Sequence, residues 1–306
     1  MITLMFGAGA SFGSGNCSPK NPPLGNDLFL ELFRLGGAFA RLNKRQKKVF
    51  LEQGFESGMA TVANDSRRIN PLQKELACYL SSFNTQPDNA YSRLFNKIKT
   101  VCDRLAIATL NYDLLIEQSL AHHRIAFNYN SEKGSMSLMK IHGSSNFLPE
   151  LGGLTLSGNV MINCGTFVEG LQTNAVSSTR EIGAWCNDPK NSDISPVLAM
   201  YAKDKRTVMN RGLVEKMQTN YSNTLLKSSH VIIVGTKYIE HDQHVWKPIS
   251  ESSADILIID PYPDSTLRWA QGIKPRRLTV LSKSFDKSVW DIAKYVRSAA
   301  YSTQKI

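Results

Sequence analysis

Several features that define other classes of protein are missing from this sequence of 306 residues. No apolar run approaches the roughly 18 to 20 residues that a membrane-spanning helix needs, and the first residues lack the basic start and apolar stretch of a secretion signal. The five cysteines include no C-x-x-C pair, which argues against a disulfide framework and against a zinc site of paired thiols. A cytoplasmic protein with reduced thiols is therefore expected.

Acidic residues are also few, with 26 Asp and Glu against 36 Lys and Arg, so the formal net charge is +10. This balance favours anionic partners such as nucleic acid, a nucleotide or an acidic protein. Local basic clusters lie at residues 41–48 and 274–277, and we interpret both as solvated surface. The chain is long enough for one large domain or two modest ones, each with a full core.

Short, β-rich apolar runs alternate with longer helix-like segments, which is typical of a parallel sheet covered by helices. Strands are expected at residues 2–6, 105–109, 138–141, 230–234, 256–259 and 278–281, and a hairpin at 154–165. Helices are expected at residues 26–42, 44–54, 71–83, 90–102, 112–122 and 212–226, and a closing helix ends near 301. The predicted fold is α/β, with a doubly wound, Rossmann-like parallel sheet and a smaller helical and irregular insertion lobe.

The expected organisation is one domain over residues 1–306, with a helical insertion at about 27–104 and an irregular one at about 151–220. In an open parallel sheet, ligands bind outside the carboxyl ends of the strands. The Gly-rich and polar turns that follow the predicted strands should therefore share one crevice.

The first of these turns, Gly7 to Ser11 (G-A-G-A-S), follows a strand directly and leads into a helix. Gly7 and Gly9 permit a tight turn in which backbone amides, including that of Ala8, approach a pyrophosphate, and Ser11 adds a hydroxyl donor. The G-x-G-x-x-G fingerprint is incomplete, because Phe12 stands at its third glycine. A structural turn without a ligand is the alternative interpretation.

Two further polar turns follow strands. Thr109, Asn111 and Asp113 (T-L-N-Y-D) stand where a strand becomes a helix, a place where such residues also serve as helix caps. His142 and Gly143 follow the third strand. An imidazole can act as a base near neutral pH or contact a ribose hydroxyl, and a glycine lets a ligand approach the backbone.

The H-D-Q-H segment contains His241 and His244, whose spacing can place two metal ligands on one face of a helix. No other cluster of possible ligands points to this segment, so we interpret it as a polar helix start with Asp242 as a cap. His122 and His123 close a predicted helix, where a cation is favourable. No metal site is predicted.

Taken together and in this order, the three turns resemble the motifs of the sirtuin family in its divergent prokaryotic branch: G-A-G-x-S, T-x-N-x-D and a catalytic H-G. Residues 231–235 (V-I-I-V-G) and 258–261 (I-I-D-P) resemble the family's later nucleotide-binding strands. The two C-x-x-C pairs of the family's zinc module are missing. P-P-L-G-N-D-L at 22–28 replaces an acid-Phe-Arg element and resembles sirtuin-like domains of bacterial anti-phage systems that hydrolyse NAD.

The resemblance implies an enzyme that cleaves NAD to nicotinamide and ADP-ribose, with NAD as substrate and without zinc. It implies Asn111 and His142 as the catalytic pair. Asn111 would hold the nicotinamide amide or the attacking water, and His142 would contact the ribose hydroxyls or act as a base. The residues expected to bind NAD are Gly7, Ala8, Gly9, Ser11, Thr109, Asp113, Gly235 and Asp260.

An enzyme that depletes NAD must be gated. The resemblance implies a homo-oligomer, a separate sensor or both, the sensor being a protein such as a ring-forming helicase-like ATPase or a short Argonaute. It also allows an indirect association with nucleic acid, and no membrane is expected. Two other functions stay open: an NAD-dependent protein deacylase, and a non-catalytic nucleotide-binding module. The role of residues 151–220, and cyclisation of ADP-ribose in place of hydrolysis, also stay open.

Overall fold

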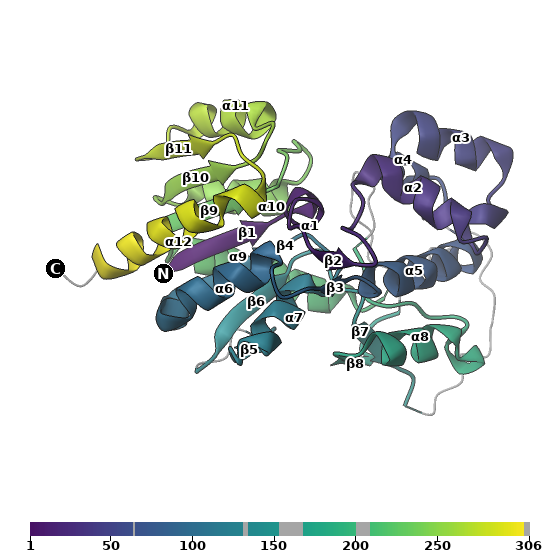
Figure 1. Cartoon of the computed structure of the whole chain (residues 1–306). Coiled ribbons are helices and arrows are strands. Elements are labelled where there is room, and N and C mark those ends of the chain that lie inside the picture. Colours follow the sequence, from purple (N-terminus) through teal and green to yellow (C-terminus); the bar gives the residue numbers. More distant parts are fainter. Residues whose placement is uncertain (64, 131–133, 153–167, 200–208, 303–306) are drawn as a thin grey trace.

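The computed structural model describes residues 1–63, 65–130, 134–152, 168–199 and 209–302, and one parallel sheet forms its centre (Figure 1). The seven strands have the spatial order β11-β10-β9-β1-β4-β6-β5, and every neighbouring pair is parallel. They span Ile2–Phe6 (β1), Leu105–Thr109 (β4), Phe127–Asn128 (β5), Met136–Lys140 (β6), His230–Val234 (β9), Asp255–Ile259 (β10) and Leu278–Leu281 (β11). The six predicted strands are confirmed to within two residues, and β5 is too short to show a pattern in the sequence.

Helices cover both faces of the sheet, because the central strands are apolar on both sides. Phe6 of β1 contacts the rings of Tyr91 and Phe285 on one face, whereas the neighbouring Met5 contributes to the core on the other face with Trp246. The first face is covered by α6 (Ala90–Ile98), α7 (Leu115–His122) and α12 (Phe285–Ser302), and the second by α9 (Arg211–Leu225), α10 (Gln243–Glu251) and α11 (Asp264–Ile273). The predicted doubly wound α/β class is therefore correct.

The winding of the chain changes direction beside β1. From β1 the chain proceeds through β4 to the edge strand β5 and comes back to β6, which lies between β4 and β5. It then returns to β9 and continues through β10 to β11. The strand order therefore reverses between β1 and β9. In doubly wound sheets, ligands bind at this kind of reversal, outside the carboxyl ends of the strands.

A helical lobe stands beside the sheet domain, at the right of Figure 1. It consists of α2 (Gly25–Arg34), η1 (Phe39–Arg41), α3 (Lys44–Gln53), α4 (Phe55–Ala60) and α5 (Ser66–Ser81). Its core is aromatic: the rings of Phe29 and Phe50 stack with centroids 4.5 Å apart, and Phe39 packs edge-on at 5.8 Å from Phe50. Residues 90–104, at the end of the predicted helical insertion, form α6 and η2 (Lys99–Arg104), and α6 packs against α12.

The described residues of the range 151–220 include regular elements that the sequence did not predict. A hairpin of β7 (Phe147–Glu150) and β8 (Gln172–Ala175) precedes α8 (Thr179–Asn187) and η3 (Pro189–Asn191), and α8 packs on α5. The last part of the range already belongs to α9, which covers the sheet. The hairpin predicted at 154–165 lies outside the described residues. Two small elements complete the fold: α1 (Ala8–Phe12), which directly follows β1, and the antiparallel pair of β2 (Cys17–Ser18) and β3 (Asn84–Thr85).

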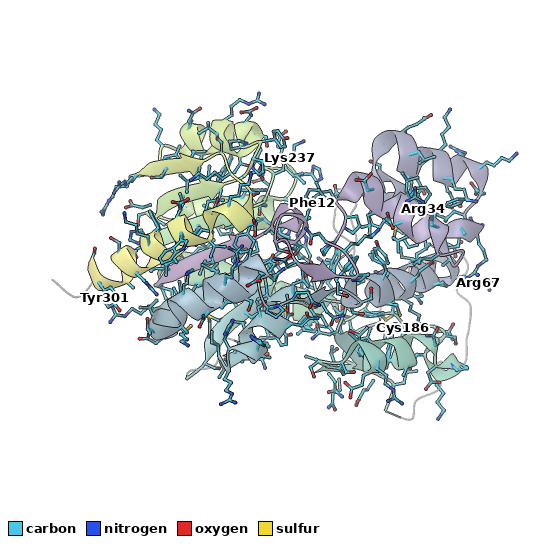
Figure 2. The ribbon with its side chains drawn as sticks, viewed as in Figure 1. Phe12, Arg34, Arg67, Cys186, Lys237 and Tyr301 are labelled. Atoms are coloured by element: carbon cyan, nitrogen blue, oxygen red, sulfur yellow. The ribbon has the colours of Figure 1, made fainter. Side chains whose placement is uncertain are left out.

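Most of the basic residues of the predicted cluster at 41–48 are exposed on the surface of the helical lobe. Arg67 lies at the outer edge of this lobe in Figure 2, and the side chain of Arg34 is 68% exposed. Within the described ranges, no helix combines the length and the apolar character needed to cross a membrane.

Candidate functional site

The first predicted turn meets the end of β9 where the strand order reverses. The amide of Gly7 donates to the Val234 carbonyl at 3.0 Å, and that of Gly9 donates to the Gly235 carbonyl at 2.9 Å. A Cβ at Gly9 would lie 2.8 Å from the latter oxygen, and one at Gly235, where φ is +59°, would collide with the Ala10 amide. These two amides thus bond to β9 and its turn instead of facing a pyrophosphate as expected, and the glycines allow the turns to pack closely.

Asn111 joins the second predicted turn to the first. Its Nδ2 donates to the Gly7 carbonyl and to Ser11 Oγ, both at 2.9 Å, and the residue is only 7% exposed. Its backbone amide donates to Thr109 Oγ1 at 3.1 Å, and that hydroxyl donates to the Phe6 carbonyl at 3.0 Å. Both side-chain amide protons of Asn111 are used in these bonds. The side chain can therefore contact a ligand only through its oxygen Oδ1, which accepts a hydrogen bond.

Asp113 is buried just before α7, where its Oδ1 accepts a hydrogen bond from the Leu115 amide at 3.2 Å. Burial raises the pKa of this carboxyl, and the charge of Lys140 and the hydroxyl of Ser11 oppose that rise. Nζ of Lys140 donates to the Asp113 carbonyl at 2.6 Å and forms an ion pair with Glu117 Oε1 at 3.1 Å. Neither Lys140 nor Glu117 was predicted from the sequence, although a lysine at the end of an apolar strand indicates a buried charge that needs a partner.

His142 lies just beyond β6 and is 6% exposed. Its carbonyl accepts a hydrogen bond from the Ala199 amide at 2.8 Å, and the next residue, Gly143, has a φ of +79°. A Cβ at Gly143 would collide with the Val197 carbonyl. The close approach that Gly143 permits is therefore to this chain segment, whereas the sequence suggested approach by a ligand. The segment belongs to the predicted insertion at 151–220, so that range helps to surround His142.

A second histidine meets His142. His244 lies in the first turn of α10, and its Nε2 is 2.9 Å from Nε2 of His142. His241 precedes the helix, so the two histidines of the H-D-Q-H segment do not share a helix face. Asp242 stands at the N-cap position but makes no side-chain capping hydrogen bond there. The sequence predicted only a polar helix start for this segment. His244 is instead in direct contact with His142, the predicted catalytic histidine.

No protein-family model and no curated protein matches the sequence. Solved structures of Sir2 homologues do match. One is the ADP-ribose complex of a Sir2 homologue with a serine-to-alanine substitution: its TM-score is 0.50 at 14% identity, and the match covers 97% of this chain and 92% of that one. A second ADP-ribose complex of a Sir2 homologue, with a histidine-to-asparagine substitution, has the same TM-score and coverage at 15% identity. The fold is Sir2-like.

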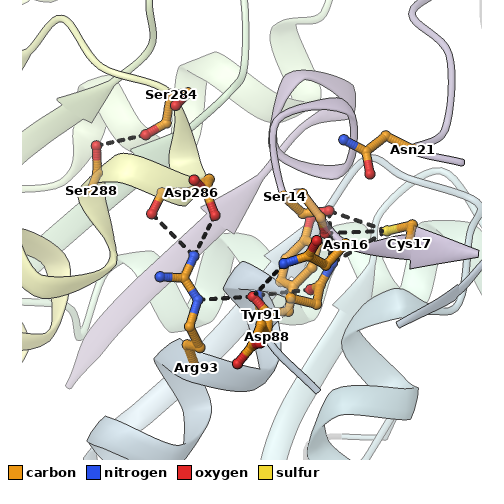
Figure 3. A network of polar contacts seen from close by, with 12 residues as sticks. Ser14, Asn16, Cys17, Asn21, Asp88, Tyr91, Arg93, Ser284, Asp286 and Ser288 are labelled. Atoms are coloured by element: carbon orange, nitrogen blue, oxygen red, sulfur yellow. Dashed lines mark hydrogen bonds and ion pairs between the residues drawn. The ribbon is translucent and has the colours of Figure 1, made fainter. Parts of the chain in front are cut away.

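Within this Sir2-like fold, the loop after α1 is held from α6 and α12 by the polar network of Figure 3. Asn89 Nδ2 donates to Ser14 Oγ at 3.0 Å and to Cys17 Sγ at 3.2 Å. Arg93 of α6 forms an ion pair with Asp286 of α12, and the amide of Asp286 donates to the Gly13 carbonyl at 3.0 Å. Burial raises the pKa of the Cys17 thiol, which stays protonated at neutral pH. This network holds the segment that follows Ser11. None of Asn89, Arg93 and Asp286 belongs to a motif that was predicted from the sequence.

Asp260 stands apart from these contacts. It follows β10, which β9 separates from β1, and its Oδ1 accepts a hydrogen bond from the Tyr262 amide at 2.7 Å. Burial raises the pKa of its carboxyl. The role expected for it, contact with a ribose, stays a prediction.

Groups that can orient water and take a proton follow two neighbouring strands of the Sir2-like fold. The amide oxygen of Asn111, the buried carboxyl of Asp113 and the imidazole of His142 follow the neighbouring strands β4 and β6. An amide oxygen can accept a hydrogen bond from water, and an imidazole can take its proton. Among the residues that the structure describes, no group of three or more His, Cys, Asp or Glu side chains is placed to hold a metal ion.

Proposed function

We propose that this chain is an NAD+ hydrolase that cleaves NAD to nicotinamide and ADP-ribose, with Asn111 and His142 as its catalytic residues. The observation that carries the proposal is the pair of 2.9 Å hydrogen bonds from Asn111 to the Gly7 carbonyl and to Ser11 Oγ. These bonds join two of the three sirtuin-like motifs on a Sir2-like fold. The ADP-ribose complexes of the two Sir2 homologues give further support.

The chemistry required fits the groups present. Hydrolysis breaks the bond between the ribose C1′ and the nicotinamide nitrogen, and the electron pair of that bond leaves with nicotinamide. Water then attacks the oxocarbenium-like C1′ and loses a proton. Asn111 Oδ1 would orient this water or hold the nicotinamide amide, and His142 would take the proton or contact the ribose hydroxyls. Because both residues are buried, bulk water is kept from the reacting carbon.

The proposed position of NAD runs across the carboxyl ends of β4, β1, β9 and β10. The residues proposed to bind it are Gly7, Ala8, Gly9, Ser11, Thr109, Asp113, Gly235 and Asp260. Since the amides of Gly7 and Gly9 bond to the end of β9, their proposed contribution is the shape of the turn.

The test is incubation of the purified protein with NAD, with nicotinamide and ADP-ribose followed by chromatography. We expect both products from the wild type, and a loss of at least about 100-fold in Asn111→Ala and His142→Ala, since each removes a group that acts on the reacting atoms. Turnover that persists in both variants would refute the assignment. A requirement for acylated peptide would favour a deacylase, and NAD binding without turnover a binding module.

A matched control separates catalysis from folding. Asn146 is as buried as Asn111 and also donates two hydrogen bonds from Nδ2, to Tyr129 Oη at 3.1 Å and to the Val176 carbonyl at 2.8 Å. Asn146→Ala should therefore lose a similar free energy of unfolding, about 1–3 kcal/mol, and keep its NAD turnover. Equal loss of turnover in the two asparagine variants would mean that Asn111 acts only through stability.

The proposed cellular role is that of the NAD-depleting effector of a bacterial anti-phage defence system. The P-P-L-G-N-D-L stretch at 22–28 supports this role, and it leads into α2 of the helical lobe. Gating is proposed to come from assembly into a homo-oligomer or from a separate sensor, either a ring-forming helicase-like ATPase or a short Argonaute. Light scattering with and without NAD, and NAD levels in phage-infected cells expressing the wild type or Asn111→Ala, test these points. Cellular NAD that falls equally with both proteins would refute the role.

A further inference from the structure

The contact between His142 and His244 is a direct nitrogen-to-nitrogen hydrogen bond. Their Nε2 atoms are 2.9 Å apart, and the ring centroids are 5.2 Å apart with an angle of 44° between the planes. A hydrogen bond between two imidazole nitrogens needs an N–H on one ring and a lone pair on the other. The contact therefore allows only paired tautomers, so the protonation of one ring constrains the other.

The two histidines reach each other from distant parts of the sheet. His142 follows β6 and His244 follows β9, and in the sheet the strands β1 and β4 lie between them. The pair thus spans the carboxyl ends of the two strands whose turns carry Ser11 and Asn111. It lies at the carboxyl end of the sheet, where the proposed reaction takes place.

Helix α9 holds both sides of the pair in place. Gln218 Nε2 donates to the Ile141 carbonyl at 3.2 Å, next to His142. Tyr221 Oη donates to the Val245 carbonyl at 3.1 Å, next to His244. These two donors lie within one helical turn of each other on α9, and Tyr221 is fully buried. The positions of the histidines are therefore set by the fold, which preorganises the contact.

We propose that His244 is a positioning residue, which fixes the ring orientation and the tautomer of His142. His142 donates its Nε2–H to His244, and this leaves Nδ1 of His142 as the basic nitrogen. In the hydrolysis proposed above, on which this inference rests, the attacking water gives its proton to Nδ1. The imidazolium that forms keeps its hydrogen bond to the Nε2 lone pair of His244, which stabilises the charge.

The kinetic test compares His244→Ala with His244→Gln, whose amide can keep a hydrogen bond to Nε2 of His142. We expect His244→Ala to lower kcat by about 10- to 100-fold with KM changed less than about threefold, because the base is present but not oriented. His244→Gln should recover most of the loss. In a His142→Ala background, His244→Ala should have no further effect, because it acts through His142. His241→Ala is the matched control on the same segment and should retain wild-type kcat.

A second readout does not depend on turnover. The chain has six histidines, so long-range ¹H–¹⁵N spectra of protein labelled at histidine can be assigned by single substitution. We expect His142 to show one tautomer with the proton on Nε2 in the wild type and an average of the two tautomers in His244→Ala. This spectrum tests the contact between His142 and His244 even if the wild type does not hydrolyse NAD. Absence of hydrolysis would refute the proposed function, and the spectrum alone would then decide whether the two histidines are paired.

Three results would overturn the inference. The first is wild-type kcat in a folded His244→Ala variant. The second is equal loss in His244→Ala and His244→Gln, both folded by their melting curves, because the hydrogen bond would then not be the cause. The third is a His142 spectrum that does not change when His244 is replaced.

Discussion

Lys140 and Glu117 form an ion pair of 3.1 Å inside the protein, and their side chains are only 1% and 9% exposed. The pair is part of a longer chain of contacts, because Glu117 Oε1 also accepts a hydrogen bond from Tyr129 Oη at 3.2 Å. Nζ of Lys140 donates as well to the Asp113 carbonyl. Lys140 therefore links the buried Glu117 carboxylate to the turn that carries Asn111 and Asp113, beside the candidate site.

Lys140→Met should destabilise the protein strongly, because it leaves the Glu117 carboxylate buried without its cation. We expect the free energy of unfolding in urea to fall by about 3–5 kcal/mol. The double variant Lys140→Met/Glu117→Gln removes both charges and should recover part of that loss. A double variant no more stable than Lys140→Met would show that packing, and not the unpaired charge, accounts for the effect.

Gly143→Ala should unfold or badly distort the turn after β6. The residue has a φ of +79°, and an added Cβ would collide with the Val197 carbonyl. Gly170 is a matched control, since its φ is also +79° but nothing lies within 4 Å of the added Cβ. We expect Gly170→Ala to cost about 1 kcal/mol of unfolding free energy from backbone strain alone, and Gly143→Ala to cost at least about 2 kcal/mol more. Equal melting temperatures for the two variants would contradict the collision.

The stability of the protein should depend on pH through Asp113. Burial raises the pKa of this carboxyl, so the folded chain binds its proton more tightly than the unfolded chain. The ionised carboxylate of Asp113 therefore lowers the free energy of unfolding. This loss is absent at pH values below the pKa of Asp113 in the unfolded chain. It grows as the pH rises through the raised pKa of the folded chain and is constant above it.

Asp113→Asn removes this loss. The variant should gain unfolding free energy relative to the wild type as the pH is raised from the acid range toward neutrality, with no relative gain in strong acid. Urea unfolding of both proteins over that pH series is the measurement. A difference that does not vary with pH would show that Asp113 titrates normally. We also expect the variant to lose NAD turnover, a trade of stability against activity.

Asn89→Ala should loosen the loop after α1. The change removes the donor to Ser14 and Cys17 and also the helix cap on the Tyr91 amide, at 3.0 Å. We expect a loss of about 1–3 kcal/mol and faster modification of Cys17 by a thiol reagent. Modification of Cys102, on η2 away from this loop, is the internal reference and should not change. Unchanged reactivity of Cys17 would mean that Arg93 and Asp286 hold the loop without Asn89.

Much of the fold could be predicted because its signals are local. The apolar runs of β1, β4, β9 and β10 are short, β-rich and continuous, as expected for strands covered on both faces. The glycine or polar residue after each run marks the end of the strand. The sequence therefore predicted that Asn111 and His142 lie at the carboxyl ends of their strands. The edge strand β5 and the buried segment near Val197 carry no such pattern and were missed.

By itself, the sequence determined the α/β class, the six longer strands and the three polar turns at their carboxyl ends. Only the tertiary structure decided which of these turns meet. Gly9 against Gly235, Lys140 against Glu117 and His142 against His244 are each contacts between elements far apart in the chain. Local propensity and spacing carry no information on strand order, and strand order decides which side chains come within hydrogen-bond distance at the edge of a sheet.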